Sequence, residues 1–537
     1  MKKKVILIVV LLALIAGGAY GIYAFQKEQK RLNMTENFFL AGDRELITVY
    51  DENKEEVTLT RGAEVAVKIN KEVEWEGAQV KEALIGETLY YIPESVLVAT
   101  REEAVINTQL YSMRPEVVYQ NIGSPVILLS IRENTPLEMT GYQNLREDGS
   151  VEYYKVKVNN QEGWLKNDEK HVAYTYTDTS FDNSRYAEYN GTGGNGASVI
   201  YYPKDGALAG NEMPEVAKTL YINAEKIEDI DEYLSIGAQT SVNAFVVDIK
   251  DTHIISYDSE VVKSYSPGSL AGINSKEEFK AAVQKLNDAG YYTIGRITVF
   301  KDSAFANDHP ETAIMNNGEL YRYNGDNWPS IFSRLVWEYN VSLAKEAVEE
   351  FGFDEIQFDY VRSPEYLPDG VDLRNDYEET RIEAITNFIR YATDVLHECN
   401  AYVSIDVFGE TSGGYVCSYG QFWPAISNAA DVISAMPYPD HFGVGYYGIP
   451  EPWKDPYRLM YYWGSAAKQC QDMTYDPAKV RTWIQAYDSI VDGTVYDASM
   501  IKAQIDGLSD AGVMDGFITW NGAASWRKFQ TYISVLQ

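Results

Sequence analysis

The spacing of apolar and polar residues divides the chain into three parts. Residues 38–178 hold short alternating stretches separated by turn residues, such as ELITVYD (45–51) and SVEYYKVKV (150–158), which is typical of small all-β modules. Residues 179–216 are rich in Gly, Asn and Ser and show no helical period, so we expect a linker, with a linker that packs on the following domain as the alternative. From residue 217 to residue 537, apolar strands alternate with amphipathic stretches such as KEEFKAAVQKLNDAG (276–290).

The third part contains eight predicted strands. Eight strands that alternate with helices over this length predict the α/β class and a (β/α)8 TIM barrel for residues 217–537. An open doubly wound sheet is the alternative, but no G-x-G-x-x-G follows the first strand, so dinucleotide binding has no support. The predicted strands are residues 219–225, 244–251, 293–300, 355–362, 402–409, 431–438, 480–488 and 516–521.

The β-rich part contains a weak internal repeat. VTLTRGAEVAVK (57–68) has a counterpart in LLSIRENTPLEMTG (128–141), and GETLYYIPESVL (86–97) has one in NQEGWLKNDEKHV (160–172). The second copy, residues 99–178, resembles bacterial SH3-like domains, and residues 38–98 resemble a degenerate copy. The resemblance implies binding of cell-wall peptides, whereas spacers or weak binders are the interpretation that we favour.

The first 27 residues predict a membrane segment. MKKK precedes an uncharged apolar run at residues 5–25, which is long enough to cross a bilayer as a helix. We expect a single-pass signal anchor, with a cleaved signal peptide and a secreted protein as the alternative. Both interpretations place the rest of the chain outside the cytoplasm.

Composition narrows the choice of partners. The 46 basic and 79 acidic residues give a formal charge of −33, which repels phosphate backbones and anionic lipids. Nucleic acid is therefore not an expected partner. The three cysteines are too few for a disulfide framework, and their spacing matches no zinc motif.

The predicted strands carry polar residues on one face only. In a barrel the outward face packs on helices, so the polar face should point to the barrel axis. Burying such groups costs several kcal/mol each unless they are paired, which argues for function. The alternative is an ion-pair network in which Arg296 and Arg362 neutralise the acids. The inward residues are Asn223, Glu225, Asp248, Lys250, Arg296, Thr298, Gln357, Asp359, Ser404, Asp406, Ser434 and Gln485.

Asp359 and Asp406 occupy matching positions on the fourth and fifth strands. Neighbouring strands lie ~4.8 Å apart, so these carboxyls could approach the ~5 Å separation of retaining glycosidases. Glu410 at the end of the fifth strand is a second candidate partner. The expected substrate-binding residues are Asp248, Arg296, Arg362, Trp328, Tyr438, Asp440, His441, Gln485 and Asn521.

Five motifs carry a resemblance to a known family. GRITVFKD, IQFDYVRSP, SIDVFG, MPYPDHF and GFITWN, in this order, resemble a bacterial glycosyl hydrolase barrel family of uncharacterised proteins, related to the α-amylases and α-galactosidases. The resemblance covers residues 217–535 and implies that Asp359 is the nucleophile. It implies an acid/base at Asp406 or Glu410 by comparison with α-amylases, or at Asp440 with His441 by comparison with α-galactosidases. The fifth-strand glutamate motif of α-amylases is not reproduced.

The leading hypothesis is a membrane-anchored, extracytoplasmic glycoside hydrolase that acts on a cell-surface or extracellular polysaccharide without a cofactor or metal. A noncatalytic protein that binds cell-wall glycan and peptide is the alternative. A metal-dependent hydrolase that uses Asp248, Asp359 and Asp406 ranks last, because the inward rows supply no histidine.

Overall fold

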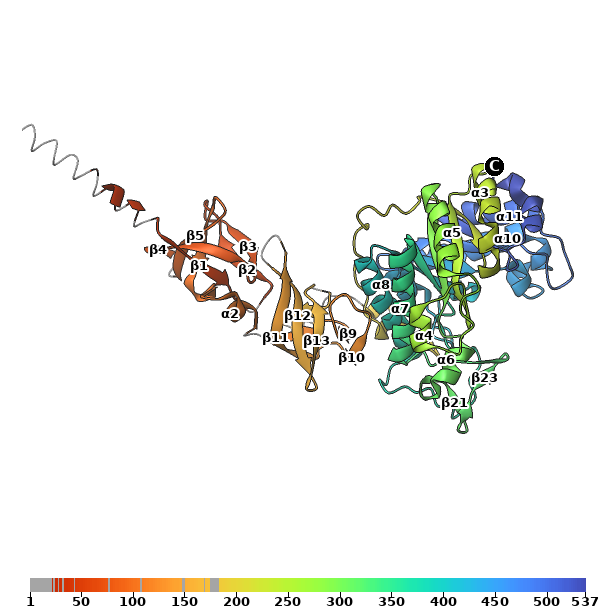
Figure 1. Ribbon diagram of the computed structural model, residues 1–537, viewed down its shortest axis with the longest axis horizontal. Coiled ribbons are helices and arrows are strands. Elements are labelled where there is room, and N and C mark those ends of the chain that lie inside the picture. The colour runs from red at the N-terminus through yellow and green to blue at the C-terminus, as the bar shows by residue number, and fades with distance from the viewer. Residues whose placement is uncertain are drawn as a thin grey trace, which may run out of the picture. The chain divides into compact units, whose positions relative to one another are not determined.

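The computed structural model describes residues 22, 25–27, 29–30, 33–42, 44–75, 78–106, 109–146, 150–168, 170–173 and 183–537. The chain forms two compact units, residues 1–122 with 128–177 and residues 123–127 with 178–537 (Figure 1). The expected membrane segment at residues 1–27 lies almost wholly outside the described residues. In the described part of the chain, no helix has the length and apolar character needed to cross a membrane.

The N-terminal unit contains two seven-stranded sheets with the same strand order. The first has the order β3-β2-β6-β5-β4-β1-β7, and the second has β10-β9-β13-β12-β11-β8-β14, so each strand of one sheet has a counterpart seven places later. The internal repeat of the sequence is thus reproduced in the topology. The strands are β1 (Thr35–Leu40), β2 (Leu46–Tyr50), β3 (Glu56–Thr60), β4 (Glu64–Trp75), β5 (Ala78–Ile85), β6 (Thr88–Pro93), β7 (Leu97–Val98), β8 (Gln109–Ser112), β9 (Glu116–Tyr119), β10 (Ile127–Ile131), β11 (Pro136–Leu145), β12 (Val151–Val158), β13 (Gln161–Lys166) and β14 (Val172–Ala173).

Each sheet encloses its own apolar core. Leu40, Val49 and Val65 are buried in the first core, and Leu137 and Val156 are buried in the second. The short helix α2 (Arg101–Ile106) follows the first sheet and buries Ala104 and Val105. The unit is therefore β-rich, as the alternating pattern predicts.

The C-terminal unit is built on a nearly closed parallel barrel. Its strands run in the order β28-β27-β26-β25-β20-β18-β17-β30-β29, and only Arg481 separates β28 from β29. All eight predicted strands are present, with the seventh divided in two, so the predicted α/β class and parallel barrel are confirmed. The strands are β17 (Ala217–Ile222), β18 (Ala244–Asp251), β20 (Tyr292–Thr298), β25 (Glu355–Asp359), β26 (Tyr402–Phe408), β27 (Val432–Met436), β28 (Lys479–Val480), β29 (Thr482–Gln485) and β30 (Gly516–Trp520).

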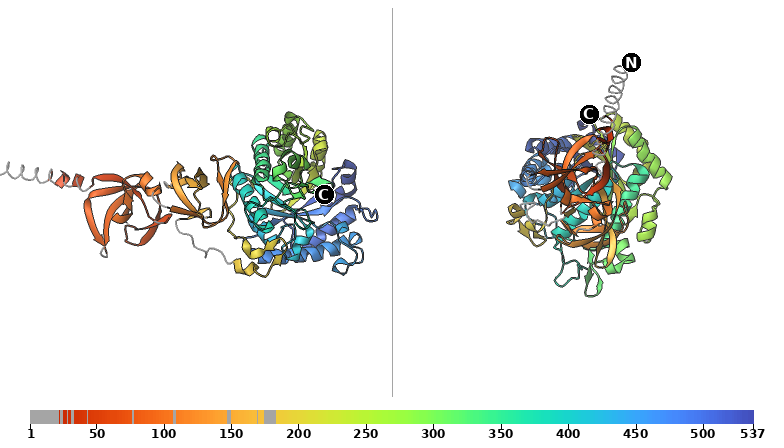
Figure 2. Two further views of the ribbon diagram at one scale, coloured as in Figure 1. Left: turned by 90° about the horizontal axis from the view of Figure 1, so that it is seen from below. Right: turned by 90° about the vertical axis from the view of Figure 1, so that its left-hand side faces the viewer.

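Helices surround these strands (Figure 2). Capping boxes begin two of them, with Ser275 and Glu278 at α5 and with Thr380 and Glu383 at α8, where each side chain satisfies a free backbone N–H. Gly352 ends α7 at a φ of 75°, a conformation that costs glycine little. The main helices are α3 (Ile230–Ala238), α5 (Lys276–Asp288), α7 (Arg334–Phe351), α8 (Arg381–Glu398), α9 (Trp423–Ala429), α10 (Pro456–Met473), α11 (Ala498–Ala511) and α12 (Trp526–Tyr532).

A long insertion follows β20. It begins with α6 (Ser303–Asp308) and contains two short hairpins, β21 (Met315–Asn316) with β22 (Glu319–Leu320) and β23 (Arg322–Tyr323) with β24 (Asp326–Asn327). Figure 1 shows these hairpins projecting from the barrel domain.

The seventh strand is divided by a buried ion pair at the amino end of the barrel. Arg481 Nη1 lies 2.7 Å from Glu355 Oε1, and Tyr292 donates to Glu355 Oε2 at 3.0 Å. Both charged side chains are almost fully buried, and each neutralises the charge of the other, which would be costly to bury alone. This ion pair links β25 to the strand that completes the barrel.

The segment at residues 183–216, which was expected to be a linker, packs on the barrel. Tyr186, Val199 and Tyr201 share an apolar cluster with Phe422. Lys204 Nζ donates to the backbone oxygens of Ser427, Asn428 and Ala430 at the end of α9. These contacts are those of an ordered part of the domain.

Candidate active site

Arg296 forms the centre of the candidate site. The register places Asp248 beside Arg296, Arg296 beside Gln357, and Gln357 beside Ser404 on successive strands. Arg296 Nη1 donates to Asp248 Oδ1 at 2.8 Å, and Nη2 donates to Asp359 Oδ2 at 2.6 Å. Its Nε lies 3.9 Å from Asp406 Oδ2. One guanidinium therefore faces three buried carboxyl groups from three strands, and the half-exposed Asp251 lies 3.8 Å from its Nη1.

Asp406 is the most deeply buried of the three acids. It is 1% exposed, and its Oδ1 accepts a hydrogen bond from Trp483 Nε1 at 2.7 Å. Its Oδ2 is buried without a hydrogen-bond partner among the described residues. Burial, and then the charge of Asp359, raise the pKa of Asp406 well above its ordinary value. The protonated form of Asp406 is therefore favoured over a wider pH range than that of a free aspartic acid.

Asp248 is bound on both oxygens. Tyr221 donates to Oδ2, and Arg296 binds Oδ1. Burial raises the pKa of Asp248 to about 6, although Arg296 opposes the shift. Asp248 thus holds one terminal nitrogen of Arg296 while Asp359 binds the other.

Asp359 is the acid that solvent can best reach. It is 5% exposed, compared with 2% for Asp248 and 1% for Asp406. Its Oδ1 accepts a hydrogen bond from the backbone nitrogen of Tyr360 at 2.6 Å, and Oδ2 binds Arg296. Tyr360 has a φ of 52°, which is strained for a residue with a side chain. Strained backbone immediately after a carboxylate is a feature of functional sites.

Glu410 lies farther out than the central acids. It is exposed and lies in the short helix η6 (Gly409–Gly413) after β26. Tyr419 donates to its Oε1 at 2.6 Å, and Tyr415 lies 3.5 Å from its Oε2. Glu410 is thus a hydrogen-bonded carboxylate at the rim of the site.

Arg362 packs against aromatic rings, including that of Trp328, close to Asp359 in the chain. The guanidinium of Arg362 lies 4.4 Å from the ring centroid of Phe408 and 5.1 Å from that of Trp328. Trp328 is only 1% exposed and also packs near Tyr360, 6.1 Å between centroids. Trp328 is expected from the sequence to bind substrate, whereas the structure buries its ring against Arg362.

Asp440 joins the loops after β27 and β29. Its oxygens accept hydrogen bonds from Gln485 Nε2 at 3.2 Å, Tyr487 at 2.8 Å and the backbone of Ile490 at 3.0 Å. His441 lies 3.9 Å away and is half exposed. These contacts make Asp440 and Gln485 a connection between two loops above the barrel.

Tyr438 lies close to the paired acids. Burial, together with the charges of Asp406 and Asp359, raises the pKa of its hydroxyl well above the ordinary value, so it stays a proton donor. Asn521, at the end of β30, is 5% exposed and donates to Ser525 at 3.4 Å, which places it in a turn.

Sequence reasoning missed two partners of the acids. Tyr221 binds Asp248, and Trp483 binds Asp406. Trp483 has the same phase along its strand as the inward Gln485, so the two-residue period contained the signal. Trp520 completes this group, with its ring centroid 5.7 Å from the Arg296 guanidinium.

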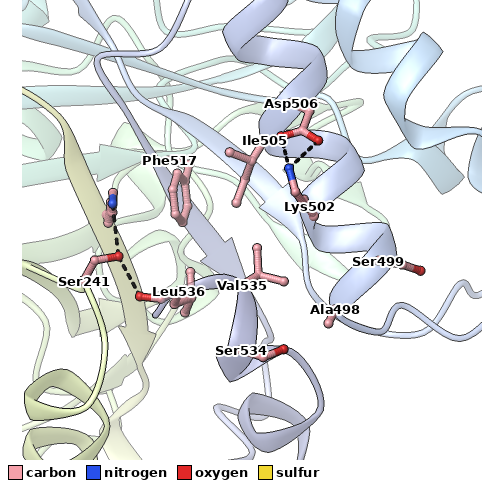
Figure 3. Close-up of a pocket in the computed structure, with 11 residues that line it drawn as sticks. Ser241, Ala498, Ser499, Lys502, Ile505, Asp506, Phe517, Ser534, Val535 and Leu536 are labelled. Atoms are coloured by element: carbon pink, nitrogen blue, oxygen red, sulfur yellow. Dashed lines mark hydrogen bonds and ion pairs between the residues drawn. The ribbon is translucent and has the colours of Figure 1, made fainter.

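A separate cavity of about 490 Å³ lies at the opposite end of the strands. It is lined by Lys218 at the start of β17, Phe517 at the start of β30 and Lys502 of α11 (Figure 3). Lys218 donates to Ser241 at 3.0 Å, and Lys502 pairs with Asp506 at 2.6 Å. Both lysines are therefore paired, and the cavity lies away from the carboxyl ends of the strands that carry Asp359 and Asp406.

A parallel barrel with paired carboxyls at the carboxyl ends of neighbouring strands is the arrangement of barrel glycoside hydrolases. Residues 219–526 match a protein family described as "Putative glycosyl hydrolase domain". The match covers more than half of the chain, and the protein belongs to this family. No protein of curated function matches the sequence.

Several solved structures are similar in part. A hypothetical protein from Ruminiclostridium thermocellum ATCC 27405 is 31% identical, with 35% of this chain and 97% of that chain covered at a TM-score of 0.30. The PgaB (BpsB) glycoside hydrolase domain from Bordetella bronchiseptica is 13% identical, with 60% and 99% covered at 0.45. A class V chitinase from Pseudomonas fluorescens Pf-5 is 14% identical, with 59% and 99% covered at 0.37.

Proposed function

We propose that the protein is an extracytoplasmic, membrane-anchored glycoside hydrolase that cleaves a cell-surface or extracellular polysaccharide with Asp359 and Asp406. The observation that carries this proposal is the sharing of one guanidinium by three buried acids. Arg296 supplies one positive charge, whereas three ionised acids would supply three negative charges. The raised pKa of Asp406 favours its protonated form, which relieves part of this excess and suits Asp406 to donate a proton.

Asp359 is placed to act as the nucleophile. Arg296 and the Tyr360 amide both donate to it, which fixes the positions of its two oxygens. It also offers the most accessible oxygen of the three acids. In the first step a bond forms between Asp359 and the anomeric carbon while the bond to the leaving oxygen breaks.

Asp406 has the environment of the proton donor. Its proton passes to the leaving oxygen in the first step, and the carboxylate then takes a proton from the water that releases Asp359 from the sugar. Its Oδ2 gains in the substrate oxygen the hydrogen-bond partner that it lacks among the described residues. This sequence of steps retains the anomeric configuration.

Glu410 is the second candidate for the proton donor. Its exposure favours it, because a leaving group reaches it without any movement of the barrel. The tyrosine hydroxyls of Tyr415 and Tyr419 hold its carboxylate at the rim. The choice between Asp406 and Glu410 is open to direct measurement.

The remaining parts of the chain fit this function. We class the barrel as a TIM barrel and the two seven-stranded sheets as SH3-like modules, a proposal supported by their common strand order. The modules act as spacers or weak cell-wall binders between the anchor at residues 1–27 and the catalytic domain.

The test is release of reducing ends from bacterial cell-wall glycans, capsular glycans and α-glucans. The unaltered chain is expected to release ends from at least one polymer, and Asp359→Asn to abolish the release. Asp258→Asn is the matched control, because Asp258 is an exposed acid that pairs with Lys263 away from the site. Binding of a glycan without release by the unaltered chain would show a noncatalytic protein.

A further inference from the structure

A line of exposed tyrosine rings crosses the barrel domain beside the site. Successive ring centroids are 4.7, 5.9, 5.6 and 6.4 Å apart. Each ring is between 38% and 43% exposed. Single exposed aromatic residues are ordinary, but a contiguous group of this kind marks a binding surface. We call this group the tyrosine track; its members, in order, are Tyr446, Tyr447, Tyr462, Tyr461 and Tyr457.

The backbone fixes the two ends of the track differently. Tyr447 lies in the short helix η8 (Tyr446–Gly448) with a φ of 52°, a left-handed conformation that costs about 1–2 kcal/mol. Tyr457 and Tyr461 are four residues apart on α10, so they lie on one helical face, and their rings are tilted by only 11°. A strained turn and a helix thus present neighbouring rings to solvent.

The track is continuous with the candidate active site. The Phe442 ring lies 4.9 Å from that of Tyr446. Phe442 also packs against Gly409, where an added Cβ would lie 3.3 Å from its Cζ. Gly409 follows Phe408, the last residue of the strand that carries Asp406. A chain bound on the track therefore leads to the rim of the carboxylate pair.

Acidic side chains outnumber basic ones along the track, because Asp510 accepts from the Tyr457 hydroxyl at 2.8 Å and Asp492 pairs with Lys454 at 3.0 Å. Residues 442–462 contain two basic side chains, Lys454 and Arg458, and two acidic ones. Lys454 pairs with Glu451 at 2.7 Å, and Arg458 pairs with Asp455 at 3.4 Å. Because the whole chain carries a formal charge of −33, an acidic polymer gains nothing here and is repelled at long range.

We infer that the tyrosine track binds a polysaccharide chain that extends from the active site, and that this chain is neutral or carries amino sugars. The inference rests on the proposed function and names its substrate class. Tyrosine suits this role, because its ring face packs on the apolar face of a sugar while its hydroxyl stays in water.

The experiment measures binding without turnover. The full chain with Asp359→Asn is run in affinity gels that contain neutral amylose, cationic chitosan or anionic polygalacturonate. The same protein is then tested with Tyr447→Ala, Tyr461→Ala and Tyr462→Ala together. The matched control replaces the same three residues by Phe, which keeps the rings and removes only the hydroxyls.

We expect amylose or chitosan to retard the parent more than polygalacturonate does. The triple Ala variant should bind at least about tenfold more weakly, as loss of aromatic anchors does at other interfaces, and the Phe variant should bind like the parent. Unchanged binding by the Ala variant, absence of binding to both amylose and chitosan, or a preference for polygalacturonate would overturn the inference.

The two proposals fail in different ways. If the unaltered chain releases no reducing ends but glycan binding depends on the three tyrosine rings, the hydrolase proposal is wrong and the binding role of the track is supported. If reducing ends are released and glycan binding is the same without the three rings, the binding role of the track is wrong and the hydrolase proposal is supported.

Discussion

Nη2 of Arg296 lies 2.6 Å from Oδ2 of Asp359, in a site where both side chains are almost fully buried. The same guanidinium binds Asp248, so its planar fork holds two carboxylates at a fixed angle. The position of Asp359 is therefore set by an ion pair that is shielded from water.

Replacing Arg296 tests this relationship. Arg296→Met leaves buried acids without their cation, so we expect a loss of about 3–5 kcal/mol in the free energy of unfolding and at least a roughly 100-fold fall in kcat/KM. Arg296→Lys keeps the positive charge but cannot bind two carboxylates with a planar guanidinium. Its unfolding free energy and its kcat/KM should therefore lie between those of the parent and the Met variant. Urea unfolding and steady-state kinetics measure the two effects. Full activity in the Met variant would show that the site does not need this cation.

The dependence of the reaction rate on pH identifies the proton donor. Because burial and Asp359 raise the pKa of Asp406, the rate should fall as pH rises through this raised pKa and Asp406 loses its proton. Asp406→Asn should remove this fall in rate with rising pH and lower kcat by about 10²–10⁴. Glu410→Gln is measured for comparison. If only the Glu410→Gln variant loses the fall in rate with rising pH, Glu410 is the proton donor.

Lys250 and Asp302 form a buried ion pair at 2.8 Å that anchors the insertion after β20. Asp302 also caps α6 by accepting from Phe305, and Lys250 donates to Asn340 of α7. Lys250→Met leaves Asp302 buried and unpaired, so we expect a loss of about 3–5 kcal/mol in unfolding free energy.

The double variant Lys250→Met with Asp302→Asn removes the unpaired charge and keeps the cap, and it should recover much of that loss. A double-mutant cycle measured by denaturant unfolding gives the coupling between the two residues. Additive losses would mean that the pair is not a unit.

His397 makes the barrel domain lose stability as the pH becomes alkaline. Burial lowers its pKa, but the nearby carboxylates of Asp205 and Asp431 outweigh burial and raise the pKa to about 9. The Nε2 atom lies 2.9 Å from Asp431. A raised folded-state pKa gives stability that is full below the unfolded value of about 6.5 and is lost as pH rises through about 9.

The His397→Gln variant should lack this pH dependence. The stability difference between the parent and the variant should therefore shrink by up to about 3 kcal/mol between pH 6.5 and 9. Unfolding at several pH values measures the difference, with His253→Gln at an exposed histidine as the control. A constant difference across this range would contradict the ion pair.

The sequence predicts the barrel well because its signal is local. All eight strands follow from apolar runs, and the inward phase of Asp248, Arg296, Asp359 and Asp406 follows from the two-residue period. Lys250 departs from that phase. A β-bulge between Asp248 and Lys250 shifts the register, so Lys250 reaches Asn340 of a helix and leaves the axial row.

Loop residues are predicted less well, because their positions depend on contacts far along the chain. Trp328 lies in a loop segment typical of exposed residues, yet Arg362 and Tyr360 cover it. Asp440 bonds to Tyr487 and Ile490, which lie about fifty residues later in the chain and which no local pattern connects to it.

The left-handed backbone of Tyr360 has a consequence for how this protein can be improved. A glycine there would relieve the backbone strain, but it would also remove the ring that packs near Trp328, Lys301 and Arg362. A search for a more heat-tolerant variant should therefore keep the aromatic ring at this strained position and look for stabilising changes elsewhere.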